Sequence, residues 1–310
     1  MIEVKNVSKY YGKVKAVDNI SFNVDKGEIV GFLGPNGAGK TTTMRVLTGF
    51  LSATEGSIKI GDHDIVENPV EAKKMIGYLP ENVPLYFEMN VTDYLGFFAD
   101  IKGINKSEKS GHIRQIIGKV GLKKVADTII GKLSKGFRQR VGIAQALIGE
   151  PDILILDEPT IGLDPNQIIE IRNLIKELGK EKTVILSSHI LQEVSALCSR
   201  IIIISEGKVV AIDTKEDLME KLEVGQRIKI LTDSDHKKVA NKMKEVKGVK
   251  HVDLVRKEGS LSEIMVSSEK EKDIRKDLSK MMITSGFNLL EQSKVTMSLE
   301  DVFIKLTGKN

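Results

Sequence analysis

The chain has 310 residues, 41% of them apolar, and carries 47 basic and 43 acidic side chains for a formal net charge of +4. This length suffices for two domains and this apolar content for a substantial core. No run approaches about 18 apolar residues, which excludes an ordinary membrane-spanning helix. The first five residues, MIEVK, are not typical of a secretory signal. The single cysteine, Cys198, excludes an internal disulfide framework and fits a reducing cytosol. We interpret Cys198 as a small buried residue of the fold.

The charge is unevenly distributed, with −1 over residues 1–220 and +5 over residues 221–310. Much of the excess lies in Lys242–Lys247 and Lys250. A solvated helix face explains these lysines, and nearness to an acidic membrane surface is the alternative. No aromatic residues interleave with them, so we expect no nucleic-acid partner.

The first 33 residues are typical of β-strands. Alternating residues predict strands at Ile2–Val4 and Ile20–Val24, and the apolar run Glu28–Leu33 predicts a buried strand. The residues that follow, GPNGAGKT, fit the phosphate-binding pattern G-x-x-x-x-G-K-[ST], with a helix expected to continue from Thr42. Such a loop points successive backbone N–H groups at phosphate oxygens, and the helix adds its positive N-terminal end. We therefore predict a nucleoside triphosphate site.

Particular residues of this loop have expected roles. Lys40 can reach the β- and γ-phosphates, and the Thr41 hydroxyl can ligate Mg²⁺. The residues expected to hold the nucleotide are Gly34, Pro35, Asn36, Gly37, Ala38, Gly39, Lys40, Thr41 and Thr42.

The remainder of residues 1–215 alternates between strand and helix. After a strand at Ser57–Ile60 and a mainly helical region over residues 91–150, the predicted elements are a strand at Ile153–Leu156, a helix at Asn166–Leu178, a strand at Val184–Ser187, a helix at Leu191–Leu197 and a strand at Ile201–Ile204. This alternation favours an α/β domain with a parallel sheet covered by helices.

Two acidic residues end one buried strand and a histidine follows another. Asp157 can hold Mg²⁺, as the second acidic motif of phosphate-loop enzymes does. Glu158 is the natural general base for a water that attacks the γ-phosphate. His189 follows Thr183–Ser188 at the edge where open α/β sheets bind ligands, so we expect it to contact the γ-phosphate.

Residues 216–310 predict a second, smaller α+β domain. The expected order is strand Gln226–Leu231, helix Lys237–Lys247, strand His251–Val255, strand Leu261–Val266, helix Glu269–Ser285, strand Phe287–Gln292 and a short helix Leu299–Leu306. The βαββαβ order is that of a ferredoxin-like fold. We expect a dimerisation or regulatory role for it.

Together these motifs resemble the nucleotide-binding subunit of an ATP-binding cassette transporter over residues 1 to about 215. The signature motif is Leu133–Arg140, LSKGFRQR, and Ile161–Asp164 matches the family's dimer-contacting loop. The resemblance implies a mixed sheet core with a helical subdomain, and ATP and Mg²⁺ as cofactors. It also implies that Tyr11 stacks on adenine and that His189 is the switch histidine. Glu81 takes the lid position, where it could ligate Mg²⁺.

The resemblance also implies a dimer. In this family the signature serine and glycine, here Ser134 and Gly136, contact the ATP of the opposite subunit, so a two-fold homodimer would complete two sites. Three residues depart from the family pattern, namely Lys135, Phe137 and Glu81. Lys135 either adds a cation near the phosphate or projects into solvent, and an ionised Glu81 cannot donate a hydrogen bond as the usual glutamine does.

As a transporter part, the chain is expected to lie on the cytoplasmic face of the membrane and to dock on a separate integral membrane permease. The expected docking groove comprises Pro84–Phe87, Tyr94, Leu95, Phe97 and Phe98, although residues of this kind also form cores. The stretches Glu81–Tyr86 and Ser298–Phe303 look most like the export-type branch. Some relatives with a Leu-Ser-Lys-Gly signature are linked to antibiotic export or gliding motility. The alternatives are a soluble cassette ATPase acting on nucleic acid or ribosomes, and a small-molecule kinase, which would not need the signature motif.

Overall fold

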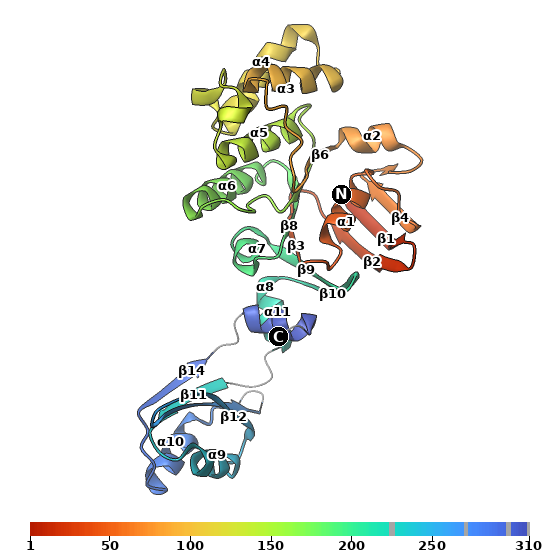
Figure 1. The fold of residues 1–310 in the computed structure, drawn as a ribbon. Coiled ribbons are helices and arrows are strands. Elements are labelled where there is room, and N and C mark those ends of the chain that lie inside the picture. Colours follow the sequence, from red (N-terminus) through yellow and green to blue (C-terminus); the bar gives the residue numbers. More distant parts are fainter. Residues whose placement is uncertain (223–226, 270–271, 296–298, 309–310) are drawn as a thin grey trace. The chain divides into compact units, whose positions relative to one another are not determined.

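The computed structural model of the chain describes residues 1–222, 227–269, 272–295 and 299–308 (Figure 1). The chain divides into two compact units, Met1–Lys215 and Glu216–Asn310. Among the described helices, none combines the length and the apolar character needed to cross a bilayer.

The first unit begins with a four-stranded antiparallel sheet. It contains β1 (Ile2–Tyr11), β2 (Val14–Val24), β4 (Glu55–Ile60) and β5 (His63–Asp64) in the order β2-β1-β4-β5. The first two strands are longer than the sequence predicts, and their register shifts between Val4 and Val7. Asn6 and Asn19 adopt left-handed backbone conformations there and join through their side chains at 3.0 Å, which breaks the regular alternation.

A six-stranded sheet forms the centre of the first unit. Its order is β10 (Lys208–Asp213), β9 (Arg200–Ser205), β3 (Ile29–Leu33), β8 (Thr183–Ser188), β7 (Ile153–Asp157) and β6 (Ile76–Leu79). The strands from β9 to β6 are parallel, and β10 is antiparallel to β9. The expected mixed sheet is therefore present, and the carboxyl ends of five parallel strands meet at one edge.

The first unit also contains helices, which alternate along the chain with the strands of this sheet. Those of the core are α1 (Lys40–Leu47), α2 (Pro69–Lys74), α6 (Pro165–Leu178) and α7 (Leu191–Leu197). The region expected to be helical contains α3 (Val91–Ile101), α4 (Lys106–Lys119) and α5 (Lys135–Leu147), with 3₁₀ turns at Lys123–Val125 and Ile130–Lys132. Aliphatic side chains from β3, β7, β8 and β9 are buried in the central sheet, as their near-continuous apolar runs predict.

The second unit contains an antiparallel sheet. Its elements are α8 (Lys215–Leu222), β11 (Arg227–Thr232), α9 (His236–Lys244), β12 (Val249–Glu258), β13 (Leu261–Ser268), α10 (Arg275–Thr284), β14 (Glu291–Val295) and α11 (Leu299–Thr307). The strand order is β12-β13-β11-β14. A separate core, with Ile228, Ile230 and Ile264 from the sheet and Val239 and Leu278 from the helices, is fully buried.

The starts of one helix and one strand in this unit differ most from the prediction. The helix expected from Glu269 starts at Arg275, because the Asp273 carboxylate accepts a hydrogen bond from the Arg275 backbone N–H at 3.1 Å and starts the helix there. The strand expected at Phe287–Gln292 starts at Glu291. Side chains bind the backbone of Asn288, whose carbonyl accepts from the Thr232 hydroxyl at 2.6 Å.

Parts of two expected elements and of one sequence stretch lie outside the described residues. They are the strand start at Gln226, positions 270–271 of the expected helix, and Ser298 of the export-type stretch Ser298–Phe303.

Candidate active site

The predicted phosphate-binding and catalytic side chains converge at the carboxyl edge of the central sheet. Lys40 begins α1 after the loop that follows β3, Asp157 ends β7 and His189 follows β8. Lys40 and His189 border a cleft of about 680 Å³, whereas Asp157 is fully buried and is not among its lining residues. The cleft is lined by Val14, Lys15, Ala16, Asn36, Gly37, Gly39, Lys40, Thr41, Thr42, Glu81, Glu158, Ile161, His189, Glu206 and Gly207.

The phosphate loop owes its shape to backbone conformations that favour glycine. Gly37 has φ of 79° and Gly39 has φ of 106°. The loop curls around the Lys40 side chain, whose ammonium donates to the carbonyls of Gly34 at 2.8 Å and Pro35 at 3.3 Å. Lys40 is buried, so its ammonium group is held inside the loop.

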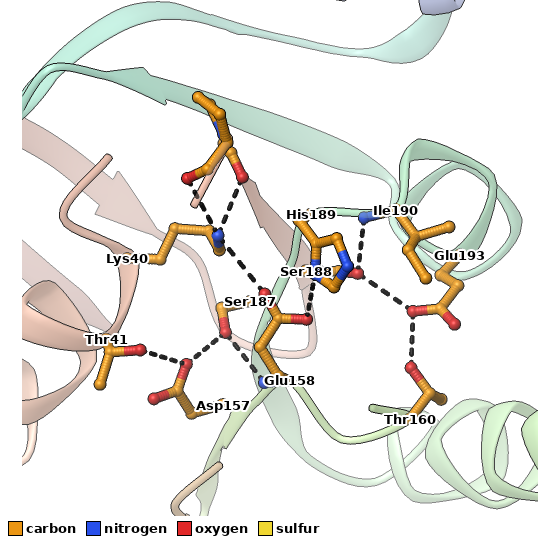
Figure 2. A network of polar contacts seen from close by, with 12 residues as sticks. Lys40, Thr41, Asp157, Glu158, Thr160, Ser187, Ser188, His189, Ile190 and Glu193 are labelled. Carbon is orange, nitrogen blue, oxygen red and sulfur yellow. Dashed lines mark hydrogen bonds and ion pairs between the residues drawn. The ribbon is translucent and has the colours of Figure 1, made fainter. Parts of the chain in front are cut away.

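Asp157 is a fully buried carboxylate with one satisfied and one unsatisfied oxygen. Its Oδ1 accepts from the Ser187 hydroxyl at 2.5 Å and from the Thr41 hydroxyl at 3.4 Å (Figure 2). Its Oδ2 is buried and has no hydrogen-bond partner among the described residues. Burial raises the pKa of Asp157, nearby Glu81 and Glu158 add to the rise, and the two hydroxyl groups oppose it.

This environment fits a divalent cation. A buried carboxylate oxygen without a donor, next to a threonine hydroxyl, is a hard oxygen ligand set of the kind that Mg²⁺ prefers. Glu81 lines the same cleft and could supply a further oxygen.

Glu158 lies between two cations or potential cations. Its Oε1 is 3.4 Å from the Lys40 ammonium, and its Oε2 is 2.9 Å from His189 Nδ1 (Figure 2). The residue adopts a left-handed conformation with φ of 48°. The backbone N–H of Glu158 donates to the Ser187 carbonyl at 3.2 Å and lies 3.0 Å from the Ser187 hydroxyl oxygen, which stabilises this conformation.

Three other predicted site residues within the described part of the chain, Tyr11, Ser134 and Gly136, do not line this cleft. Tyr11 ends β1 and is 47% exposed as a residue, and the Lys9 ammonium lies 5.7 Å from its ring centroid.

Ser134 is the N-cap of α5, where its hydroxyl accepts from the Phe137 backbone N–H at 3.4 Å. Gly136 is buried in the first turn of α5, against the Gln167 side chain. The Lys135 ammonium packs directly against Gly162, in the loop that follows Glu158. Lys135 is nevertheless exposed, and whether its charge acts near a phosphate stays a prediction.

The sequence reasoning missed Ser187, which binds both Asp157 and the Glu158 backbone. A hydroxyl residue at the carboxyl end of a buried strand was the available signal. It also missed Val14–Ala16 and Glu206–Gly207, which line the cleft from the first sheet and from the turn after β9. These positions come from distant segments and carry no local motif.

The chain is similar to known ATP-binding proteins of one transporter family. The family model described as ABC transporter matches residues 17–161. The linearmycin resistance ATP-binding protein LnrL of Bacillus subtilis (strain 168) is 34% identical over 310 residues, which cover 100% of this chain and 99% of that protein. The bacitracin transport ATP-binding protein BcrA of Bacillus licheniformis is 36% identical over 314 residues, covering 99% of this chain and 97% of that protein.

A solved structure is also similar to the first unit. The dimeric post-hydrolysis state of the ATP-binding cassette MJ0796, bound to ADP and Pi, superposes with a TM-score of 0.63 at 27% identity. The match covers 69% of this chain and 98% of that one.

Proposed function

The chain belongs to the ABC transporter family as an ATP-binding subunit that hydrolyses ATP, and from this premise we propose that it drives export through a separate membrane permease. The observation that carries the proposal is the match over nearly the whole chain to LnrL and BcrA, whose names describe linearmycin resistance and bacitracin transport. The chain would then lie on the cytoplasmic face of the membrane, attached through the permease.

We propose that Glu158 is the general base of hydrolysis. Its carboxylate would accept a proton from the water that attacks the γ-phosphate. Lys40 now lies 3.4 Å from one oxygen of this carboxylate. If the Lys40 ammonium turned to the β- and γ-phosphates, that oxygen would be released for the water.

His189 is proposed to contact the γ-phosphate. Its Nδ1 lies 2.9 Å from Glu158 Oε2, so the hydrogen on Nδ1 would be held by the carboxylate. The imidazole could then donate from Nε2 to a phosphate oxygen only in its protonated form, because a neutral ring carries one N–H.

Asp157 and Thr41 would hold Mg²⁺, with Glu81 as a further ligand. The support is the unpartnered Oδ2 of Asp157 beside the Thr41 hydroxyl. When bound, the ion would neutralise charge on the β- and γ-phosphate oxygens.

We propose that ATP joins two copies of this chain head to tail. Ser134 and Gly136 lie at the N-terminus of α5 and do not line the cleft of their own chain, so a second chain would have to present them to the nucleotide. Tyr11 would stack on the adenine. Size-exclusion chromatography of Glu158→Gln with ATP and Mg²⁺ tests the pairing: we expect a dimer that Ser134→Arg abolishes, and a Glu158→Gln protein that stays monomeric would contradict it.

The permease is proposed to contact the exposed part of the aromatic cluster after Glu81. Tyr94 and Leu95 are buried, and Tyr94 donates a hydrogen bond to Gln145, so these two belong to the core. Tyr86 and Phe97 are 50% and 40% exposed, and their ring centroids lie 5.7 Å apart, which leaves an apolar surface for a partner.

Co-purification with the permease tests this surface and the transport function together. The Tyr86→Ser/Phe97→Ser variant should lose the membrane partner and keep basal ATPase activity. Val66→Ser, which changes an exposed apolar residue elsewhere, should keep both. If the wild-type chain recovered no membrane protein and its ATPase were stimulated by DNA or ribosomes, the transport proposal would fail.

For the second unit we propose a ferredoxin-like fold with a dimerisation or regulatory role. The support is the βαββαβ order together with the antiparallel strand order β12-β13-β11-β14. A chain that ends at residue 222 and keeps the same ATPase rate and the same self-association would remove the role.

A further inference from the structure

A buried carboxylate outside the cleft joins the two segments that carry the proposed catalytic residues. Glu193 lies in the first turn of α7 and is only 5% exposed. Its Oε2 accepts from the Thr160 hydroxyl at 2.6 Å and from the Ser188 hydroxyl at 3.0 Å (Figure 2). The two donors come from separate segments, one after β7 and one at the end of β8.

On the β8 side, Glu193 fixes the turn that holds His189. The Ser188 hydroxyl donates to Glu193 and accepts from the Ile190 backbone N–H at 3.0 Å. Ser188 and Ile190 are the two neighbours of His189 in the chain. The carboxylate therefore orients the backbone on both sides of the histidine.

On the β7 side, Glu193 fixes the turn that follows Glu158. Thr160 is buried two residues after Glu158, and the Ile161 N–H closes the turn by donating to the Glu158 carbonyl at 3.2 Å. Glu158 itself is in a left-handed conformation, which persists only where surrounding contacts enforce it. The bond from Thr160 to Glu193 is one such contact.

We propose that Glu193 is a positioning residue for hydrolysis. It holds the segments that carry Glu158 and His189 at a fixed separation, so that Glu158 Oε2 lies 2.9 Å from His189 Nδ1. The inference rests on the roles proposed above for Glu158 and His189. Glu193 lies outside the set of residues that line the cleft, so it acts through these two segments and not on the nucleotide.

The hydrogen bonds also indicate which replacements keep this arrangement. Both hydroxyl donors use Oε2, while Oε1 is buried with no partner in the described part of the chain. Glutamine can keep an acceptor oxygen at the Oε2 position, so it should preserve both bonds. Alanine removes the acceptor and leaves two buried hydroxyl groups unsatisfied.

The test measures steady-state ATP hydrolysis by full-length variants. For Glu193→Ala we expect kcat to fall about 10- to 100-fold, as when reacting groups are displaced by about 1 Å, with KM for ATP within about twofold of wild type. Glu193→Gln should stay within about threefold of the wild-type kcat, since it retains the acceptor.

A double mutant separates this local role from general damage. Thr160→Val removes one donor at nearly constant volume and should lower kcat by a smaller factor. The Glu193→Ala/Thr160→Val double variant should be no slower than Glu193→Ala, because both changes break the same bond. Ser195→Ala is the matched control on α7, where the hydroxyl donates to the Leu191 carbonyl at 2.8 Å and has no other side-chain hydrogen bond within the described part of the chain; it should keep the wild-type rate.

Several results would overturn the inference. They are a wild-type kcat for Glu193→Ala, a glutamine variant as slow as the alanine variant, or additive effects in the double variant. If Glu193→Ala does not fold by circular dichroism, a wild-type kcat for Thr160→Val overturns it instead. Glu158→Gln distinguishes a failure of the proposed general base from a failure of the positioning role. An active Glu158→Gln enzyme refutes the proposed general base. An inactive Glu158→Gln enzyme together with a fully active Glu193→Ala enzyme refutes only the role of Glu193.

Discussion

Adding a methyl group at Gly39 should damage the phosphate loop far more than adding one at Gly37. Gly39 has φ of 106°, and left-handed conformations cost a residue with a side chain about 1–2 kcal/mol. A Cβ at Gly39 would also lie 2.4 Å from the Ala16 carbonyl oxygen in β2, so one backbone segment must move. Forced displacement of packed groups adds about 1–3 kcal/mol. Gly37 has a comparable φ of 79° but no atom within 4 Å of the added Cβ.

We therefore expect Gly39→Ala to lower the free energy of unfolding by about 3 kcal/mol and Gly37→Ala by about 1 kcal/mol. Urea unfolding followed by far-ultraviolet circular dichroism, without nucleotide, measures both values. Any transition of the second unit should be unchanged in either variant and serves as an internal reference. Equal losses for the two variants would refute the argument from the Ala16 contact. Because α1 starts at Lys40, Gly39→Ala should also weaken ATP binding by at least about tenfold.

Three further predictions concern buried groups. Burial raises the pKa of the Cys198 thiol, so we expect a thiol reagent at pH 8 to label the folded protein at least about tenfold more slowly than the urea-unfolded protein; equal rates would contradict this. Tyr94→Phe removes the hydroxyl that donates to Gln145 Oε1 at 2.5 Å and should lower the free energy of unfolding by about 1–2 kcal/mol, measured in urea, with unchanged ATP affinity. Burial raises the pKa of Asp157, so its ionised form opposes folding above that pKa, and Asp157→Asn should raise the melting temperature at neutral pH in EDTA. The gain should shrink as the pH falls and the wild-type carboxyl becomes protonated; a gain that grows toward low pH would show that the sign is wrong.

The sequence predicts best those features that local chemistry imposes on consecutive residues. The phosphate loop must combine glycines with Lys40 and Thr41 over a few positions, so its pattern is visible in the chain. The strands that end near Asp157 and His189 are buried on both faces and read as apolar runs. Each of these strands was predicted within two residues of its observed bounds.

Elements that depend on distant partners were harder to predict. The strand β6 has four residues and pairs with β7, about 75 positions later in the chain, and its sequence around Tyr78 has no clear alternation. The start of α10 at Arg275 depends on a side-chain bond from Asp273, which outweighs the helical pattern of the preceding residues. Register shifts in β1 and β2 likewise arise from pairing and not from either strand alone.

The same distinction separates the residues that would touch ATP from those that hold them in place. Lys40, Asp157 and Glu158 belong to recognisable motifs because the phosphate chemistry restricts both their type and their spacing. The geometry of Glu158, however, depends on Ser187, which anchors its backbone, and on Glu193, which binds the following turn through Thr160. An acidic residue in the first turn of a helix ordinarily stabilises the helix from the surface, so only the three-dimensional structure distinguishes the buried Glu193 from such a residue. Sensitivity of ATP hydrolysis to substitution should therefore extend beyond the motifs to these supporting side chains, and it should appear in kcat more than in KM, since neither Ser187 nor Glu193 lines the cleft.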